Sequence, residues 1–358
     1  MGTYISKKMK IALITIWHER NYGAELQAYA TIKLFQGLGH EIEMINIRLE
    51  DLYPLSIKRI VGNCLRLISP SEKHFRSFWN KYIPKTRRYR SLMELRENPP
   101  KADCYLVGSD QVWNPILTKE LTPAYFLDFG GENIKRFSFA SSFGTAEWTQ
   151  IQYTDKIRSW LSRFNFVTCR ETSGVALLKD VFNINSHVVV DPTLLLADYS
   201  EIVSHKTKRN TLVYYPLNED YELEYYSKKL ALKLGLRPIN NKESSYLFSK
   251  IEWKRVSIEK WVENIATSSF VVTRSFHGMV FCLIYHKQFA VLAGKNGRGT
   301  RLKSLLSLVG LEHRYFESID DLDSNKPWEE QIDYDVVEDK IIKLRSNSMI
   351  ILQKMLEV

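Results

Sequence analysis

Short apolar runs alternate with longer helical patterns along most of the chain. Lys10–Trp17 is an apolar run of strand length, and Tyr22–Leu38 follows it with helical spacing and ends between Gly37 and Gly39. Glu41–Ile47 then predicts a second strand. A strand, a helix and a strand in this order predict a β-α-β unit with a right-handed crossover and parallel strands.

The rest of the sequence keeps this alternation, which is typical of the α/β class. No internal repeat or low-complexity tract interrupts it. The further predicted strands are Cys104–Val107, Phe137–Ser141, Phe166–Cys169, His187–Val190, Thr211–Tyr215, Ser269–Thr273 and Phe289–Leu292, and the further predicted helices are Thr149–Asn165, Thr172–Lys179, Glu219–Leu234, Ile258–Ser268, Gly278–Tyr285, Arg301–Val309 and Asp335–Leu356.

A polar and basic break at Ala197–Asn210 predicts a boundary between two domains. A chain of 358 residues is also longer than a single core usually serves. We therefore assign residues 1–205 to an amino-terminal domain with a basic helical insertion at about 55–95, and residues 206–330 to a carboxy-terminal domain. Residues 331–358 are expected to form a helix that packs back.

The expected location is the cytoplasm. The first apolar stretch ends at His18-Glu19-Arg20 without a small-residue cleavage site, which argues against a signal peptide. The later apolar stretch Phe270–Tyr285 contains Arg274 and His277, which argues against a transmembrane helix.

The net charge and the cysteine content limit the kinds of partner and metal site that we expect. The net charge of +9 favours anionic partners, but the chain has no nucleic-acid-binding module, so no nucleic acid is expected. The four cysteines are far apart and form no CxxC pair. No His, Asp or Glu spacing predicts a metal site.

Residues 57–90 are rich in Lys and Arg and contain a single acidic residue, Glu72. Two interpretations stay open for this segment. A basic amphipathic helix can dock on anionic lipid, here at the inner face of the membrane. The same pattern also fits a solvated helix that packs on the first domain.

The first candidate motif lies between the first predicted strand and the first predicted helix and contains His18, Asn21 and Gly23. In open α/β sheets, ligands bind at the carboxyl ends of the strands, where a helix start offers free N–H groups to a phosphate or carboxylate. Gly23 permits close backbone approach. The alternative is a helix capped by Asn21 with a turn glycine.

The second motif follows the strand Cys104–Val107 and contains Ser109, Asp110, Gln111 and Trp113. Loops at strand ends often carry function because a rigid scaffold holds them. Asp110 can act as a base on a sugar hydroxyl, and Trp113 can stack on a sugar ring. The alternative is an Asx turn with a buried tryptophan.

The third motif is Arg170-Glu171, again between a strand and a helix. An arginine at a strand end can hold a carboxylate or phosphate bidentately. The alternative is a surface ion pair of little energetic weight. Asp191-Pro192-Thr193 is interpreted as an architectural turn.

The fourth motif, Arg274-Ser275-Phe276-His277-Gly278, follows the strand Ser269–Thr273 and opens a helix. An anion is favoured at such a helix start, and a histidine there can transfer a proton at neutral pH. Arg301 lies beyond a glycine-containing basic loop and can reach an anion or be solvated.

Together these motifs resemble the polysaccharide pyruvyl transferase family from Lys10 to about Arg314. The resemblance implies two Rossmann-like domains with parallel sheets in a GT-B-like arrangement around a cleft. It implies phosphoenolpyruvate as donor, a glycan hydroxyl pair as acceptor, and a pyruvate ketal and phosphate as products. Family members commonly have an arginine where this chain has Ser275, and Arg274 lies one residue earlier.

A mechanistic hypothesis follows from the resemblance. His277 protonates the methylene carbon or assists phosphate departure, and Asp110 is the base. The acceptor is a sugar or a lipid-linked oligosaccharide, and no cofactor or metal is required beyond phosphoenolpyruvate as co-substrate. The donor-binding candidates are Arg170, Arg274, Ser275, Arg301, Asn21 and Gly23, and the acceptor-binding candidates are His18, Ser109, Gln111 and Trp113.

Two other functions are compatible with the sequence. A nucleotide-sugar glycosyltransferase of the same two-domain architecture would release a nucleotide instead of phosphate. A non-enzymatic glycan-binding module is supported only by aromatic content, which core packing explains as well.

Overall fold

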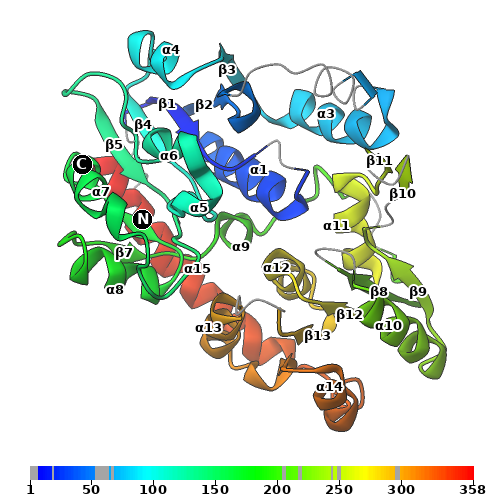
Figure 1. The fold of residues 1–358 in the computed structure, drawn as a ribbon. Helices are drawn as coiled ribbons and strands as arrows, with labels where there is room; N and C mark the ends of the chain where they lie inside the picture. Colours follow the sequence, from blue (N-terminus) through cyan, green and yellow to red (C-terminus); the bar gives the residue numbers. More distant parts are fainter. Residues whose placement is uncertain are drawn as a thin grey trace. The chain divides into compact units, whose positions relative to one another are not determined.

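The computed structural model of the chain describes residues 7–17, 20–52, 64–65, 68–203, 207–216, 220–242, 245–247, 251–294 and 299–358. The chain divides into two compact units (Figure 1). Unit 1 comprises Met1–Leu55, Trp79–Leu196 and Lys343–Val358, and unit 2 comprises Ser56–Phe78 and Ala197–Ile342.

Unit 1 is built on a five-stranded parallel sheet with the strand order β3-β2-β1-β4-β5. A short parallel pair, β6 and β7, continues beside β5 through the isolated bridge Phe137–Phe166. The strands are β1 (Lys10–Ile14), β2 (Glu41–Ile47), β3 (Lys85–Tyr89), β4 (Cys104–Val107), β5 (Lys135–Ser138), β6 (Thr168–Cys169) and β7 (His187–Val188).

Helices join these strands and cover the sheet. β4 is buried at every position, as expected for a central parallel strand with both faces covered. The helices of unit 1 are α1 (Tyr22–Gly37), α4 (Leu92–Glu97), α5 (Pro115–Thr118), α6 (Thr122–Tyr125), α7 (Thr154–Leu161), α8 (Thr172–Asp180) and α9 (Pro192–Leu196), while α3 (Pro70–Tyr82) and α15 (Tyr334–Glu357) each run from one unit into the other.

Unit 2 repeats the plan with the parallel order β14-β13-β12-β8-β9. A separate antiparallel pair is formed by β10 (Ser245–Leu247) and β11 (Ile251–Lys254). The other elements are β8 (Thr211–Tyr215), β9 (Arg237–Asn240), β12 (Phe270–Thr273), β13 (Gln288–Leu292), β14 (Tyr315–Phe316), α10 (Tyr221–Lys233), α11 (Ile258–Thr267), α12 (Phe276–Ile284), α13 (Thr300–Val309) and α14 (Ile319–Asn325).

The predicted fold class, α/β with two Rossmann-like domains of parallel sheet, is confirmed. Each sheet has a switch point, where the order of consecutive strands changes direction. It lies between β1 and β4 in unit 1 and between β8 and β12 in unit 2. Ligands of open α/β sheets bind at the carboxyl ends of the strands at such points.

The structure changes two details of the predicted organisation. The chain passes from unit 1 to unit 2 between Leu196 and Ala197, and the last residues of α15 return to unit 1. The basic segment predicted to be helical contains the edge strand β3 at Lys85–Tyr89. Thr86 and Tyr89 favour a strand, and an edge position tolerates many exposed cations. Residues 53–63 and 66–67 lie outside the described part.

Among the described residues, no helix combines the length and the apolar content needed to span a membrane.

His40 makes the stability of unit 1 depend on pH. This residue is 4% exposed, and its Nδ1 accepts a hydrogen bond from the backbone N–H of Met9 at 3.2 Å. Burial lowers the pKa of His40 below its ordinary value, so the folded protein binds a proton here at lower pH than the unfolded chain does.

We expect stability to fall as pH drops below about 6.5, because the unfolded chain then binds a proton at this position and the folded chain does not. The loss is at most about 1.4 kcal/mol per pH unit. The replacement His40→Asn keeps an acceptor for Met9 and removes the titration. Urea unfolding at several pH values should show a smaller slope in the variant, and an unchanged slope would contradict this assignment.

Candidate functional site

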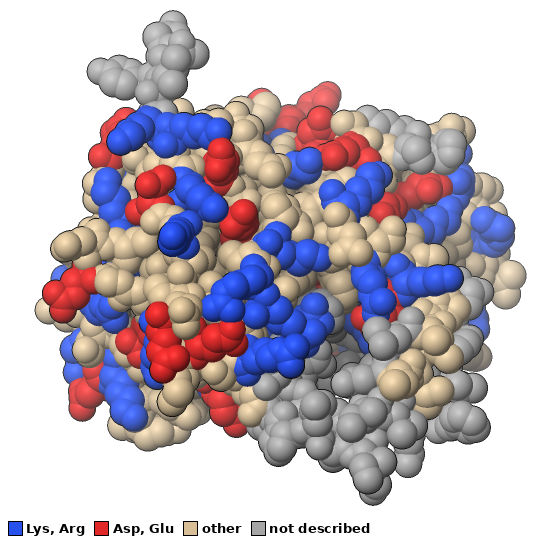
Figure 2. Space-filling model, turned by 90° about the horizontal axis from the view of Figure 1, so that it is seen from above, with Lys and Arg blue, Asp and Glu red and all other residues tan. Residues whose placement is uncertain are grey.

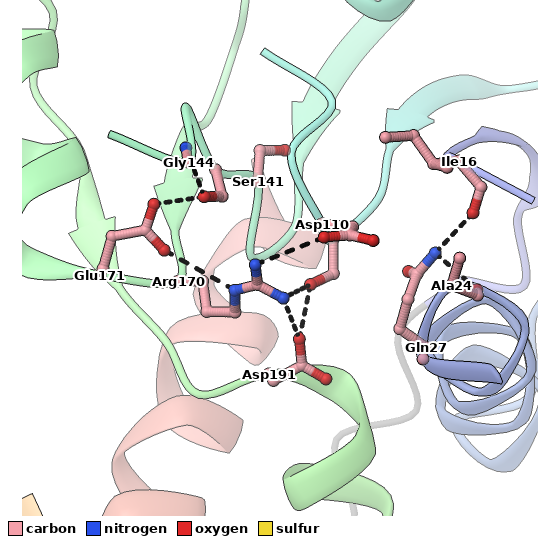
Figure 3. Close-up of polar contacts among 12 residues, drawn as sticks. Ile16, Ala24, Gln27, Asp110, Ser141, Gly144, Arg170, Glu171 and Asp191 are labelled. Carbon is pink, nitrogen blue, oxygen red and sulfur yellow. Dashed lines mark hydrogen bonds and ion pairs between the residues drawn. The ribbon is translucent and has the colours of Figure 1, made fainter. Parts of the chain in front are cut away.

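The switch point of unit 1 is held together by Thr15 and Gln27. Thr15 follows β1, and its hydroxyl donates to the backbone oxygen of Ser109 after β4 at 2.7 Å. The Gln27 amide on α1 donates to the Thr15 hydroxyl at 2.9 Å and to the backbone oxygens of Ile16 and Ala24 at 2.9 and 3.0 Å (Figure 3). These bonds fix the ends of β1 and β4 and the first turns of α1 to one another.

Arg170 occupies the centre of the same region. Figure 3 shows its guanidinium surrounded by Asp110, Glu171 and Asp191. Nη1 lies 2.7 Å from Asp191 Oδ2, Nη2 lies 3.5 Å from Asp110 Oδ1, and Nε lies 3.6 Å from Glu171 Oε2. The side chains of Arg170 and Asp191 are 3% and 1% exposed, so this is a buried ionic cluster.

One guanidinium therefore faces three carboxylates. Burial by itself lowers the pKa of Arg170, but the surrounding negative charge outweighs burial and raises this pKa above its ordinary value. The cluster keeps a net negative formal charge. The resemblance assigns Arg170 to the donor, and in the structure its guanidinium is engaged by carboxylates of its own chain. Carboxylates can accept hydrogen bonds from hydroxyl groups.

Asp191 is more than an architectural turn. Its Oδ2 accepts from the Ser109 hydroxyl at 2.9 Å as well as from Arg170, and its Oδ1 accepts from the backbone N–H and the hydroxyl of Thr193. Asp191 thus joins the end of β4 to the start of α9. This role of Asp191 is not apparent from the sequence pattern, in which its position after a predicted strand is the one signal.

Asp110 is the most accessible of the three acids, with a side chain that is 14% exposed. Its backbone is left-handed, with φ of 76°, and forms a parallel bridge with Ser141. A non-glycine residue holds this conformation only where its surroundings fix it, and such strain is concentrated at functional sites. The predicted base is therefore presented at the strand end by a strained turn.

A second turn supports the cluster from the other side. The Ser142 hydroxyl donates to Glu171 and accepts from the backbone N–H of Gly144 at 2.9 Å. Gly144 has φ of 75°, and a Cβ there would lie 2.1 Å from Gln111 Oε1. Gln111 therefore packs directly on the Gly144 backbone beside the cluster.

The other candidates of unit 1 have different positions. Trp113 is fully buried, stacks on Phe126 at a centroid distance of 5.7 Å and contacts Phe143. The structure thus corrects its assignment to the acceptor, since this ring is part of the core. Asn21 is exposed and caps α1 by accepting from the backbone N–H of Gly23 at 3.0 Å. His18 lies outside the described residues.

The four predicted site residues of unit 2 lie near the switch point of its sheet. Arg274 follows β12, and its Nε lies 2.8 Å from Asp220 Oδ2 before α10. The Arg274 guanidinium also donates to the backbone oxygen of Ala293 at the end of β13. Arg274 thereby connects the segments that follow β8, β12 and β13. Its partner Asp220 is not among the residues that the sequence predicted for this site.

Ser275 begins α12 as its N-cap. Its hydroxyl accepts from the backbone N–H of Gly278 at 3.2 Å, and its own N–H donates to Thr273 Oγ1 at 3.0 Å. His277 is in the first turn, 7% exposed, with its ring against Phe276. The Arg301 guanidinium lies 5.9 Å from the centre of the Phe276 ring, so Arg301 is brought to this helix start from α13.

The two sites thus differ in charge within their own units. Acidic groups predominate in the unit 1 site. In unit 2, Arg274 is paired with Asp220 and its Nη2 lies 3.9 Å from Glu222, so the positive character of the α12 start comes from the helix end itself and from Arg301 beside Phe276. Among the described residues, no group of three or more His, Cys, Asp or Glu side chains is arranged to hold a metal ion.

The sequence model of the polysaccharide pyruvyl transferase family matches residues 21–296, which is most of the chain. The matched segment contains Asp110, Arg170 and Asp191 of unit 1 and Arg274, Ser275 and His277 of unit 2, whereas Thr15 and Arg301 lie outside it. The chain belongs to the polysaccharide pyruvyl transferase family. As a member of this family it is a transferase with a polysaccharide acceptor. A comparison with curated protein sequences finds no match.

Solved structures resemble the fold. A candidate UDP-N-acetylglucosamine 2-epimerase from Listeria monocytogenes has a TM-score of 0.50 at 12% identity, covering 95% of this chain and 91% of its own. An alpha-glucosyltransferase in complex with UDP-glucose and DNA has a TM-score of 0.48 at 13% identity, covering 95% of this chain and 94% of its own. At such identities the likeness concerns the fold alone.

Replacing Arg170 tests the buried cluster. In Arg170→Met, three carboxylates lose their shared cation, and we expect the free energy of unfolding to fall by about 3–5 kcal/mol. The loss should shrink as pH falls, because protonated carboxylates no longer repel one another. Arg158→Met, which breaks an exposed pair with Asp155, should cost less than about 1 kcal/mol. Equal losses in urea unfolding would refute the cluster's role.

Gly278 offers a steric test of the unit 2 site. A Cβ at Gly278 would lie 2.6 Å from Thr273 Oγ1, so Gly278→Ala should destabilise the protein by about 1–3 kcal/mol. Additional removal of the hydroxyl in Thr273→Ala/Gly278→Ala should restore part of this loss. The control Gly37→Ala, where nothing lies within 4 Å, should be neutral or stabilising in the same urea assay. A harmless Gly278→Ala would contradict the tight contact.

Proposed function

We propose that the protein transfers the enolpyruvyl group of phosphoenolpyruvate to a glycan and closes it into a pyruvate ketal. What supports this proposal is the family match over residues 21–296, whose motifs occupy the carboxyl ends of the switch-point strands in both units. Phosphoenolpyruvate is the co-substrate, and the reaction requires no further cofactor or metal.

The charges of the two units suggest which substrate each one binds. The donor carries a phosphate and a carboxylate, which suit the start of α12 with Ser275 and with Arg301. Arg274 is paired with Asp220, so it would bind the donor only by sharing its guanidinium between the two. The acceptor brings hydroxyl groups, which suit the carboxylate cluster at Asp110 in unit 1. Arg170 is then a positioning residue, because it holds the carboxylates and touches neither substrate in this proposal.

The reaction involves three proton transfers. His277 delivers a proton to the methylene carbon of the donor, and a sugar oxygen attacks the resulting cationic carbon while Asp110 takes the hydroxyl proton. The second sugar hydroxyl then forms a bond to the same carbon, and the bond from that carbon to the phosphate oxygen breaks. Phosphate leaves with the second hydroxyl proton, and the methyl group keeps the proton from His277. Asp110 then releases its proton to solvent and His277 takes one up, which restores both residues for the next cycle.

The acceptor in this proposal is a precursor of a cell-surface polysaccharide, carried on a lipid at the cytoplasmic face of the membrane. Contact of the basic segment 57–90 with anionic phospholipid would place the enzyme beside such an acceptor. Vesicles of anionic lipid are the probe for this contact.

The decisive measurement is phosphate release from phosphoenolpyruvate with a panel of glycoside acceptors, with product mass as second readout. His277→Ala and Asp110→Asn should each reduce phosphate release by about a hundredfold or more, as expected for loss of a general acid or base. Asp110→Asn should still be stabilised thermally by phosphoenolpyruvate, because the proposed donor site is in unit 2.

Matched controls are exposed residues of the same type. His286→Ala removes a ring that is 48% exposed, and Asp155→Asn changes a carboxylate that is 94% exposed. Both should leave phosphate release unchanged. Near-normal turnover in His277→Ala, or release of a nucleotide from a nucleotide sugar in place of phosphate, would overturn the proposal.

A further inference from the structure

A groove of about 760 Å³ lies along the β3 edge of unit 1, where it follows this strand from Lys85 to Tyr89. It begins at Lys10 and Lys85, the first residues of β1 and β3, and includes Lys101 before β4. From the first to the fifth residue of β1 the strand rises roughly 13 Å at about 3.3 Å per step, so the amino end of this strand is that far from the switch point. A single sugar bound at Asp110 does not reach the groove.

The groove has more positive than negative charge. Arg87 is paired with Glu94 at 2.5 Å, and Lys10 lies 3.7 Å from Glu43. Two cations remain that are not balanced in this way. The Lys85 ammonium donates to the neutral side-chain oxygen of Asn80 at 3.0 Å. Lys101 is exposed and forms no ion pair within the described part of the chain.

The surroundings of Lys85 favour an anion. Burial lowers the pKa of Lys85, and the positive charge of Arg48 lowers it further. A bound carboxylate would offset both effects. Thr86 and Asn98 add neutral hydrogen-bonding groups to the lining, and Pro99 adds apolar surface, which suits the hydroxyls and ring faces of a sugar chain.

We infer that this groove binds a carboxylate-bearing stretch of polysaccharide, remote from the sugar that reacts. The inference rests on the proposed function for its ligand, since each ketal formed would add one carboxylate to the polymer. Sugars of the polymer that already carry a ketal would then be held at Lys85 and Lys101, while an unmodified sugar of the same polymer occupies the Asp110 site. The site would make long acidic glycans better ligands than short or neutral ones.

Protection of a sheet edge and contact with a membrane account less well for the basic groove. Basic side chains protect edge strands such as β3 from pairing with other chains, but Lys10 and Lys101 are not on β3. Figure 2 looks onto the side where α4 and β3 lie in Figure 1, and shows Lys and Arg side chains gathered there beside acidic ones. A bilayer could use this charge, but a concave groove lined by neutral hydrogen-bonding groups fits a chain-like ligand better.

The test is titration calorimetry with an oligogalacturonate and with a neutral galactose oligomer of the same length. The unmodified protein should bind the acidic oligomer at least tenfold more tightly. Lys85→Gln/Lys101→Gln should weaken that binding roughly tenfold, about fivefold or less for each lost charge pair. The control Lys135→Gln/Lys156→Gln changes two exposed lysines of unit 1, has the same net charge and should bind normally.

Several outcomes would refute the site. They are equal losses in both double variants, equal binding of the neutral oligomer, or no binding of the acidic one. Sedimentation of the protein with phosphatidylglycerol vesicles but not phosphatidylcholine vesicles, lost only in Lys85→Gln/Lys101→Gln, would instead assign the groove to a membrane. Transfer to a short glycoside should be the same in both variants. If that transfer is absent in every protein while groove binding persists, the proposed reaction fails and the groove remains.

Discussion

The contact between Arg170 and Asp191 is the constraint on which the unit 1 site depends. It is buried, short and shared with Ser109, so it joins the ends of β4 and β6 to the start of α9. A buried ion pair of this kind seldom adds net stability over apolar packing, but removing one partner is costly. The Arg170–Asp191 pair instead fixes the geometry of the site. With Arg170 held in place, Asp110 and Glu171 lie on the two other edges of the same guanidinium.

That geometry has a chemical consequence. The guanidinium is shared among carboxylates of its own chain, and under the proposed function the carboxylate at the rim of the cluster, Asp110, accepts a proton from a hydroxyl. In unit 2 the arginine after β12 is also held by acids, Asp220 and Glu222, but the amino end of α12 carries the positive end of the helix dipole. Each unit thus has a site of its own at the carboxyl ends of its switch-point strands, and under the proposed function one accepts a polyol and the other an anion.

The sequence was sufficient to predict the fold and the position of the motifs, because strand-end loops follow from the alternation of short apolar runs and helices. It was insufficient to predict where side chains point. Trp113 follows a strand-end motif as a sugar-stacking ring would, but its neighbours Phe126 and Phe143 enclose it in the core. Arg170 has the same sequence context as an anion-binding arginine, and only the return of the chain at Asp191 shows what it binds. Contacts between distant segments decide both cases.

Helix capping explains why this chain has Ser275 where other family members commonly have an arginine. An N-cap requires a short side chain that bends back to the backbone, and Ser275 does so by accepting from Gly278. An arginine at this position would remove the cap, and the arginine one residue earlier is turned to Asp220. Under the proposed function, the positive charge that the motif lacks is supplied from α13, where Arg301 lies over the Phe276 ring beside His277. The chain can therefore keep an anion-binding helix start while changing the residue that marks it in sequence.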